Sequence, residues 1–478
     1  MPDLIPLNRS ERAYAALEGV AGSVTQVYEM TFDRRLDPAV VRAAARALVA
    51  AYPRTRMRLV VGAFSTRLGL MDNDDPLLEP LFDEAFRVVD GVAGDEERLA
   101  AYRNALLSES FSLGRSLPVR VRLAQDERGS TLFFIVHHLV CDGRGMIQMI
   151  DELLGALAGK PITPVTVDAL EMRRALWPKG WARKLRAAFL DWRRLRAARR
   201  VARSRTLVDP LRPLPAFTAP RVVRHTLGLP VTQLVATARA HGTSLTALTL
   251  AALTMVLARR EGAASDGTRE VATRISVDLR PFFDPPQPNA FGNFVASFMV
   301  RCVRFDQLAP LIADIAAQLK EGTRRFRDHE RGFGLLMDEL STWIGLRLYG
   351  LAARRLKTRG KLTPMSAHYS TVGSVDHLLR HDVGLVDMAG YAPNTGLFVT
   401  SMGFRDQLRM ALIYPTGGLS AEQACQLARD LEETLARMSE AQPVGDRQGE
   451  RADAPAREVR GLTATNTGRL PAGSLAPG

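Results

Sequence analysis

The sequence predicts a mixed α/β protein built from two lobes of similar size. Its 478 residues exceed what one compact core holds and suit two lobes of about 200 residues each. Strand-like apolar runs alternate with segments of helical periodicity in both halves of the chain. An Arg- and Pro-rich stretch separates the halves. We therefore expect a first lobe at 1–165, a connection at 166–220, a second lobe at 221–440, and a disordered tail at 441–478 that is poor in large apolar residues.

Periodicity and capping signals predict the individual elements. In chain order these are a helix at 38–51, a strand at 132–136, a helix soon after it, a helix at 244–259 and a largely helical stretch at 320–361. Two strand-like runs flank Phe404-Arg405-Asp406 and predict a hairpin. The last helix begins at Ser420, whose spacing to Gln423 is that of a capping box.

Composition bounds the class of protein. Apolar residues make up 46% and charged residues 24% of the chain, as in soluble globular proteins. Cys141, Cys302 and Cys425 are scattered and odd in number, which favours a reducing compartment over a disulfide framework. The first residues lack the features of a secretory signal, and no uncharged apolar run reaches about 18 residues. We expect a cytoplasmic protein, with attachment to the inner face of the membrane as the alternative to a freely soluble one.

Most of the net charge of +13 lies in the connection between the lobes. Between Arg173 and Arg205 the chain has 13 Lys or Arg and one acid, Asp191. A helical projection places several large apolar residues on one arc with basic residues beside it. The residues expected to face a membrane or an acidic partner are Trp177, Trp181, Arg183, Lys184, Trp192, Arg193 and Arg194.

Three interpretations of this basic segment stay open. An amphipathic basic helix suits an anionic membrane surface. It also suits the acidic helix of an acyl carrier protein or the phosphates of coenzyme A. The third interpretation is a solvated helix that packs its tryptophans against the lobe below. Nucleic acid is not an expected partner, because no recognition motif is present and the charge is confined to one insert.

Seven residues carry the main functional signal, His137-His138-Leu139-Val140-Cys141-Asp142-Gly143. They follow the predicted strand at 132–136 and precede a segment with helical apolar spacing. The two histidines and the aspartate are therefore expected on a short loop, where a rigid scaffold presents catalytic groups.

This HHxxxDG motif resembles the active-site motif of the condensation-domain superfamily. That superfamily is related to chloramphenicol acetyltransferase and includes polyketide-associated acyltransferases, alcohol acyltransferases and wax ester synthases. Further segments resemble its other signatures in the expected order, at 36–38, 111–120, 276–281, 289–294 and, more weakly, 369–373. The resemblance spans about residues 1 to 440. The chain lacks the DFGWG motif of the plant branch and a clear PLW motif of wax ester synthases.

The resemblance implies a pseudo-dimer of two chloramphenicol-acetyltransferase-like lobes with an active-site channel between them. It implies that His138 acts as general base and that no covalent acyl-enzyme forms. His137, Asp142 and Gly143 shape the loop, and Arg280 stands where the family has an arginine that pairs with the aspartate. Asn293, Tyr369 and Ser370 are expected to line the pocket. No metal or tightly bound cofactor is implied; the co-substrate is an acyl-CoA or acyl carrier protein thioester, and the acceptor is a hydroxyl or an amine.

The residues themselves support these roles while leaving alternatives. A histidine with a pKa near ~6.5 accepts a proton at neutral pH. Asp142 also suits a helix N-cap, and Gly143 suits either a tight turn or a close approach to the pantetheine arm. Cys141 occupies an unconstrained position, and nothing nearby lowers its pKa. We predict an acyltransferase without fused partner domains, acting on a lipid-like or glycolipid alcohol. The alternatives are an amide-forming condensation enzyme and a non-enzymatic relative that binds a lipid or a partner.

Overall fold

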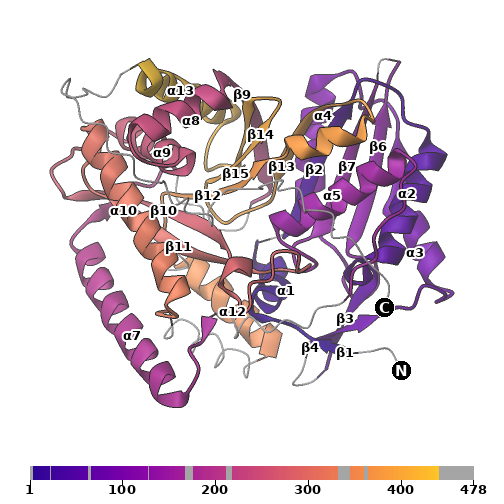
Figure 1. Ribbon diagram of the computed structural model, residues 1–478, viewed down its shortest axis with the longest axis horizontal. Helices are drawn as coiled ribbons and strands as arrows, with labels where there is room; N and C mark the ends of the chain where they lie inside the picture. The colour runs from indigo at the N-terminus through magenta and orange to yellow at the C-terminus, as the bar shows by residue number, and fades with distance from the viewer. Residues whose placement is uncertain are drawn as a thin grey trace, which may run out of the picture.

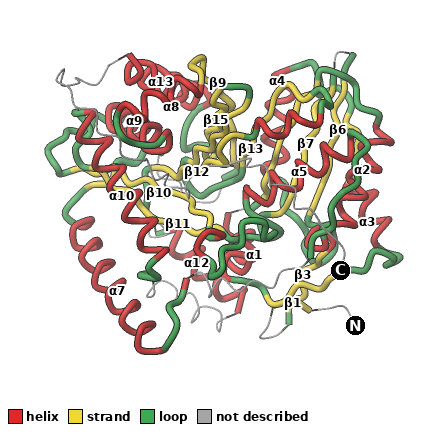
Figure 2. The backbone as a smooth tube through the Cα atoms, viewed as in Figure 1, coloured by secondary structure: helices red, strands yellow, loops and turns green. Residues whose placement is uncertain are grey.

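Two large β-sheets, one in each half of the chain, organise the computed structural model (Figures 1 and 2). The structure describes residues 4–21, 23–62, 66–127, 129–166, 176–211, 218–331, 345–359 and 364–440. The predicted tail at 441–478 lies outside these residues. The helices are α1 (Arg9–Ala21), α2 (Pro38–Ala51), α3 (Leu78–Ala85), α4 (Glu96–Ser108), α5 (Gly143–Leu157), α7 (Trp181–Arg203), α8 (Val231–Ala240), α9 (Leu245–Arg260), α10 (Leu308–Arg327), α12 (Gly345–Thr358) and α13 (Ala421–Glu440).

The first sheet has five strands in the order β13-β2-β7-β6-β5. They are β13 (Leu385–Tyr391), β2 (Thr25–Phe32), β7 (Ser130–His137), β6 (Val119–Gln125) and β5 (Phe86–Val89). Side chains alternate along β7, so Phe134 packs with α2 and α5 while Phe133 packs with α4 on the other face. Burial on both faces explains why this strand is a continuous apolar run in the sequence. A separate three-stranded sheet is formed by β1 (Leu4–Pro6), β4 (Thr66–Leu70) and β3 (Met57–Val61).

The second sheet has the strand order β11-β10-β12-β14-β15-β9, with the short β8 beside β10. Its strands are β11 (Val295–Cys302), β10 (Arg269–Asp278), β12 (Ala367–Ser374), β14 (Phe398–Phe404), β15 (Gln407–Pro415), β9 (Pro220–Pro230) and β8 (Thr206–Leu207). Helix α9 lies almost wholly inside this lobe, in contact with α8, α10 and α13. The apolar core of the second lobe is built around it.

The two lobes are joined by more than the connecting segment. Strand β13 comes from the second half of the chain yet pairs with β2 in the first sheet. Arg224 on β9 donates to Glu29 on β2 at 2.7 Å, and Glu29 is buried. The predicted range 221–440 therefore supplies one strand to the sheet of the first lobe, and this crossover fixes the lobes against one another.

Most of the elements predicted from local signals are confirmed. Helix α2 spans the predicted residues and begins with Pro38 after the N-cap Asp37, whose side chain accepts from the Ala39 amide at 2.8 Å. The predicted hairpin is β14–β15, with Arg405 and Asp406 at φ 50° and 55° in its two-residue turn.

Two more predictions concern the second half of the chain. The capping box forms, since Ser420 and Gln423 exchange hydrogen bonds of 2.9 and 3.1 Å. The described part of the stretch predicted to be largely helical at 320–361 contains the end of α10 and all of α12, with a turn after Arg327 in which His329 adopts φ 55°. Residues 332–344 and 360–361 lie outside the described residues.

Among the described residues, no single helix is long and apolar enough to span a membrane. The bent pair α8–α9 has the length and composition for a broken span, but α9 is buried in the core of the second lobe.

Candidate functional site

The HHxxxDG loop joins the end of β7 to the start of α5. Strand β7 ends at His137, a turn covers 138–140, and α5 begins at Gly143. The His137 amide bonds to Pro118 and the His138 amide bonds to Val24, each at 2.9 Å. The loop is thus anchored by the backbones of its neighbours, which fixes where its side chains point.

Asp142 fastens this loop to the second half of the chain. Its carboxylate accepts from Arg280 at 2.9 and 3.1 Å and from the Phe294 amide at 2.9 Å. It also caps α5 by accepting from the Gly145 amide at 3.0 Å. Both roles considered for Asp142 are therefore present together. The Arg280 charge holds the pKa of Asp142 below its ordinary value, against the opposing effect of burial.

Arg280 is the largest fully buried side chain of the described residues and has several partners. Besides Asp142 it donates to Asp278 at 2.9 Å and to the Ala290 carbonyl at 2.7 Å. Its guanidinium lies 4.9 Å from the centre of the Phe294 ring. Such a saturated set of acceptors allows a buried arginine to stay charged.

The segment 289–294 closes over the same loop. The Gly292 carbonyl accepts from the Asp142 amide at 3.2 Å and from Arg280 at 3.1 Å. Gly292 adopts φ 149°, and a Cβ there would meet the Phe294 ring at 3.2 Å. Glycine is thus required where this backbone approaches the motif.

His138 lies between residues from both halves of the chain. The Asn293 amide group donates to the His138 carbonyl at 2.5 Å and lies 3.1 Å from the ring nitrogen Nδ1. On the other side, the Tyr14 ring stacks on the imidazole, with 4.0 Å between ring centres and 11° between planes. Burial lowers the pKa of His138 to about 4, although hydrogen bonds to the carbonyls of His138 and Cys141 and the charge of Asp142 act in the opposite direction. The imidazole is therefore neutral at pH 7.

The neighbouring His137 has a different environment. It is fully buried, its Nδ1 accepts from the Leu139 amide at 3.0 Å, and its ring packs edge-on against Phe111. Because Nδ1 accepts, the proton lies on Nε2, which is 3.5 Å from the carboxylate of Glu18. These contacts hold the His137 ring in the interior beneath the loop.

Cys141 and Gly143 also belong to the motif, and their contacts are those of structural residues. Burial holds the pKa of the Cys141 thiol well above its ordinary value, so the thiol stays protonated. Gly143 is the first residue of α5 and has no positive φ, so a left-handed backbone is not what requires glycine there. A Cβ at Gly143 would meet Val372 at 3.1 Å and the Tyr28 hydroxyl at 3.4 Å, so glycine lets these two side chains pack close to the backbone.

The three predicted pocket residues lie in different places in the structure. Asn293 is at His138, as described above. Tyr369 is wrong as a pocket residue: it is buried in the core of the second lobe, where its hydroxyl lies 2.7 Å from that of Ser401. The alternation of β12 causes this, because Tyr369 and Ser370 point to opposite faces. Ser370 is partly exposed.

Two further residues interact with His138: sequence reasoning missed Tyr14, and for His368 it favoured a surface or packing role over a place in the pocket. Tyr14 lies on α1, whose capping box is visible in the sequence as Asn8 and Glu11 and forms with bonds of 2.7 and 3.0 Å. His368, next to Tyr369, is held by Ser276 at 3.0 Å and by Asn394 at 2.7 Å. Burial, with the charges of Arg274 and His138, holds the pKa of His368 well below its ordinary value. No local signal distinguishes His368 in the sequence.

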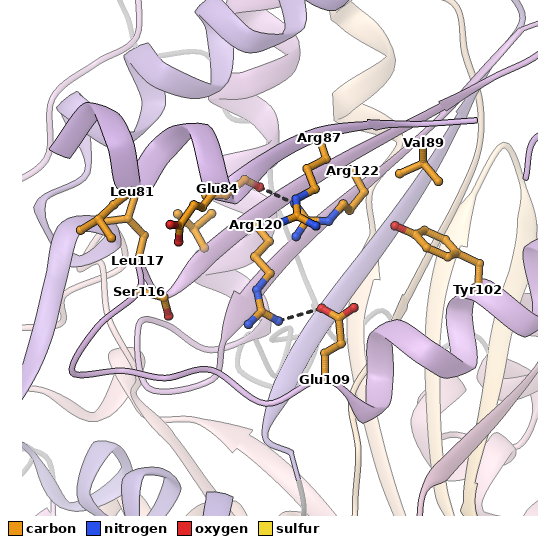
Figure 3. Close-up of a pocket in the computed structure, with 12 residues that line it drawn as sticks. Leu81, Glu84, Arg87, Val89, Tyr102, Glu109, Ser116, Leu117, Arg120 and Arg122 are labelled. Carbon is orange, nitrogen blue, oxygen red and sulfur yellow. Dashed lines mark hydrogen bonds and ion pairs between the residues drawn. The ribbon is translucent and has the colours of Figure 1, made fainter. Parts of the chain in front are cut away.

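A pocket of about 460 Å³ lies elsewhere in the first lobe, between β5, β6 and α4 (Figure 3). Arg87, Arg120 and Arg122 line it, and Arg120 donates to Glu109 at 3.0 Å. Arg122 is buried and donates to the Ala85 carbonyl at 2.5 Å. None of the HHxxxDG residues lines this pocket.

The basic connection differs from its predicted layout. Trp177 precedes α7 and packs against the second-lobe core, so it does not share the exposed arc, and Lys184 lies 5.6 Å from its ring. Trp181 and Trp192 are on α7 and exposed, beside the exposed Arg183, Arg193 and Arg194. No group of three or more His, Cys, Asp or Glu suited to a metal ion occurs in the described part of the chain.

Comparison with solved structures identifies the architecture, whereas no family model and no curated protein matches the sequence. The first condensation domain of the calcium-dependent antibiotic synthetase, in complex with a substrate analogue, superposes with a TM-score of 0.69 at 17% identity, covering 92% of this chain and 98% of that one. Trichothecene 15-O-acetyltransferase TRI3 from Fusarium sporotrichioides gives 0.67 at 11% identity, covering 91% and 94%. The chain has the condensation-domain fold. Polyketide synthase associated protein 5 from Mycobacterium tuberculosis shares it, with a TM-score of 0.59 at 18% identity over 91% and 98% of the two chains. The predicted fold class is thereby confirmed.

Proposed function

We propose that this protein is an acyltransferase that moves an acyl group from a thioester donor to a hydroxyl or amine acceptor, with His138 as general base. The donor is acyl-CoA or an acyl carrier protein thioester. The observation that carries this proposal is the position of a neutral imidazole between the lobes, held by Asn293 and Tyr14.

A general base needs one ring nitrogen with a free lone pair. A neutral imidazole has one unprotonated nitrogen, and burial keeps the His138 ring neutral at pH 7.

In the proposed step, the acceptor oxygen or nitrogen attacks the thioester carbonyl while the unprotonated ring nitrogen of His138 takes its proton. The tetrahedral intermediate then collapses, the C–S bond breaks, and the thiolate leaves with the proton from the imidazolium. The negative charge that develops on the carbonyl oxygen raises the pKa of His138 during attack, which strengthens a base that is weak in the free enzyme. No covalent acyl-enzyme is formed, and the thioester serves as co-substrate without a tightly bound cofactor.

The surroundings of the ring support this assignment over thiol chemistry. Asp142 is committed to Arg280 and to the cap of α5, so its role is to hold the loop. Cys141 is buried with a raised pKa and lacks the thiolate that a nucleophile requires. The fold adds support, because one neighbour is described as an O-acetyltransferase and another as a condensation domain bound to a substrate analogue.

The first experiment measures free thiol released from acyl-CoA, and from an acyl carrier protein thioester, with a panel of alcohols and amines. Acceptor-dependent thiol release is expected, with an ester or amide product that distinguishes acyl transfer to alcohols from amide-forming condensation. Intact mass of the protein incubated with donor alone should show no added acyl group. A stable acyl adduct would contradict the mechanism. If no acceptor in the panel supports thiol release, the protein would be a binding protein and not an acyltransferase.

A further inference from the structure

Helix α7 exposes a row of large apolar side chains that the rest of the described chain leaves uncovered. Trp181 is 76% exposed, Leu185 59%, Phe189 54% and Trp192 37%. Their spacing of four, four and three residues places them on one side of the helix. We call these four residues the α7 ridge.

The helix is fixed to the protein by a different face. Ala187, Ala188 and Asp191 are buried, and Asp191 accepts from Arg325 on α10 at 2.5 Å. Arg194 also pairs with Glu330, just beyond α10. The face of α7 that packs against the protein is therefore not the face that carries the ridge. In the third interpretation of this segment the tryptophans pack on the lobe below, and this holds only for Trp177.

The charge around the α7 ridge is almost entirely positive. Helix α7 carries nine Lys or Arg and one acid, Asp191, which is buried against Arg325. Arg193 lies 5.9 Å from the Phe189 ring and Arg196 lies 5.4 Å from the Trp192 ring. The exposed surface thus combines aromatic side chains with an excess of cationic groups, the pattern of an interfacial amphipathic helix.

Helix α12 presents a second surface of the same kind at the same end of the molecule (Figure 1). Leu348, Leu351 and Leu356 are 60%, 52% and 44% exposed, and Arg354 and Arg355 lie exposed among them. Two separate convex helices with the same chemistry fit a flat, extended surface.

We propose that the α7 ridge and the exposed leucines of α12 insert into the interfacial region of an anionic lipid membrane, with the surrounding arginines binding the headgroups. This proposal does not depend on the acyltransferase assignment. It has a consequence for that site, because α12 packs against α1, which carries Tyr14. The lipid-facing end of the molecule then lies one helix away from His138.

Flotation of the full chain with vesicles tests the proposal. Phosphatidylcholine vesicles containing phosphatidylglycerol should carry the protein upward, while pure phosphatidylcholine vesicles should carry little. Trp181→Ala/Phe189→Ala should weaken binding about tenfold or more, because two large side chains lose their insertion into lipid. Val201→Ala is the matched control, since Val201 is 45% exposed on the same helix but lies off the ridge. It should float as the wild type does.

The contribution of the arginine charges and the insertion of the apolar side chains are measured separately. Arg183→Gln/Arg186→Gln should weaken binding about fivefold for each charge removed and reduce its salt dependence. Tryptophan emission should shift to shorter wavelength with the anionic vesicles, and this shift should shrink in a Trp181→Phe variant. Thiol release with water-soluble substrates should be unchanged in all these exposed variants.

The proposal is overturned by equal binding to both kinds of vesicle, by no binding to either, or by a double ridge variant that floats as well as the wild type. Binding to an acyl carrier protein that is lost in the ridge variant, with no binding to vesicles, would assign the surface to a protein partner instead.

Discussion

Arg280 and Asp142 form a bidentate ion pair across 138 residues of sequence, with N–O distances of 2.9 and 3.1 Å. Both side chains are buried, at 1% and 5% exposed. The pair ties the HHxxxDG loop of the first half to the segment after β10 in the second half. Through this pair, the position of His138 depends on the packing of the two lobes.

Asp142→Asn should therefore destabilise the protein as well as reduce its activity. The substitution leaves the Arg280 charge buried with only Asp278 as a charged partner, and breaking a buried pair costs about 3–5 kcal/mol. Urea unfolding followed by tryptophan fluorescence measures the loss. Asp278→Asn is the control and should cost less, because Asp142 keeps both bonds to Arg280. Equal stability of Asp142→Asn and the wild type would mean that the pair does not hold the loop.

The pH dependence of kcat/KM should report the depressed pKa of His138. A base with a pKa of about 4 stays neutral from pH 8 down to about pH 5, so activity should be flat there and fall only as the ring is protonated below that range. Intrinsic fluorescence recorded in the same buffers separates this fall from acid unfolding. An acid limb centred on the ordinary histidine value of 6.5 would argue against a buried imidazole as the base.

Asn293→Asp should move that acid limb to higher pH. A carboxylate beside Nδ1 favours the charged imidazolium and raises the pKa of His138. A merely structural role for Asn293 would change stability or the rate without moving the pH profile. Asn293→Ala supplies the comparison, since it should lower kcat with little change in the acid limb.

Tyr14 should act through its ring and not through its hydroxyl. Tyr14→Phe keeps the stack on His138 and should retain activity within a few-fold, whereas Tyr14→Ala removes it. Aromatic pairs of this kind contribute about 0.5–1.5 kcal/mol, so a loss of roughly two- to tenfold in kcat/KM is expected for Tyr14→Ala. A large loss in Tyr14→Phe would assign the hydroxyl a direct role.

The fold was predictable where local signals and the HHxxxDG resemblance agreed. Helix α2, the β14–β15 hairpin and the cap of α13 each follow from residues within a few positions of one another. The pairing of β13 with β2 has no such signal, because it joins segments more than three hundred residues apart by backbone hydrogen bonds alone.

The residues of the candidate site also fall into two groups, those that a motif predicts and those that it does not. His138, Asp142 and Arg280 come from motif positions, and the structure brings them together. Tyr14 and His368 reach the site through tertiary packing, which periodicity does not encode. Tyr369 was misplaced because neighbouring residues on β12 face opposite sides, and a motif match does not indicate which side meets the site. The connection was misjudged at Trp177, where the helix projected from sequence begins only at Trp181.

The most direct test of the account is acceptor-dependent thiol release by His138→Gln, compared with wild type and with Cys141→Ala at equal folded concentration. A positioned general base contributes roughly 10²- to 10⁴-fold, so His138→Gln should lose that much kcat while Cys141→Ala keeps most of the wild-type rate. Wild-type rates in His138→Gln would remove the imidazole from the reaction and with it the proposed mechanism.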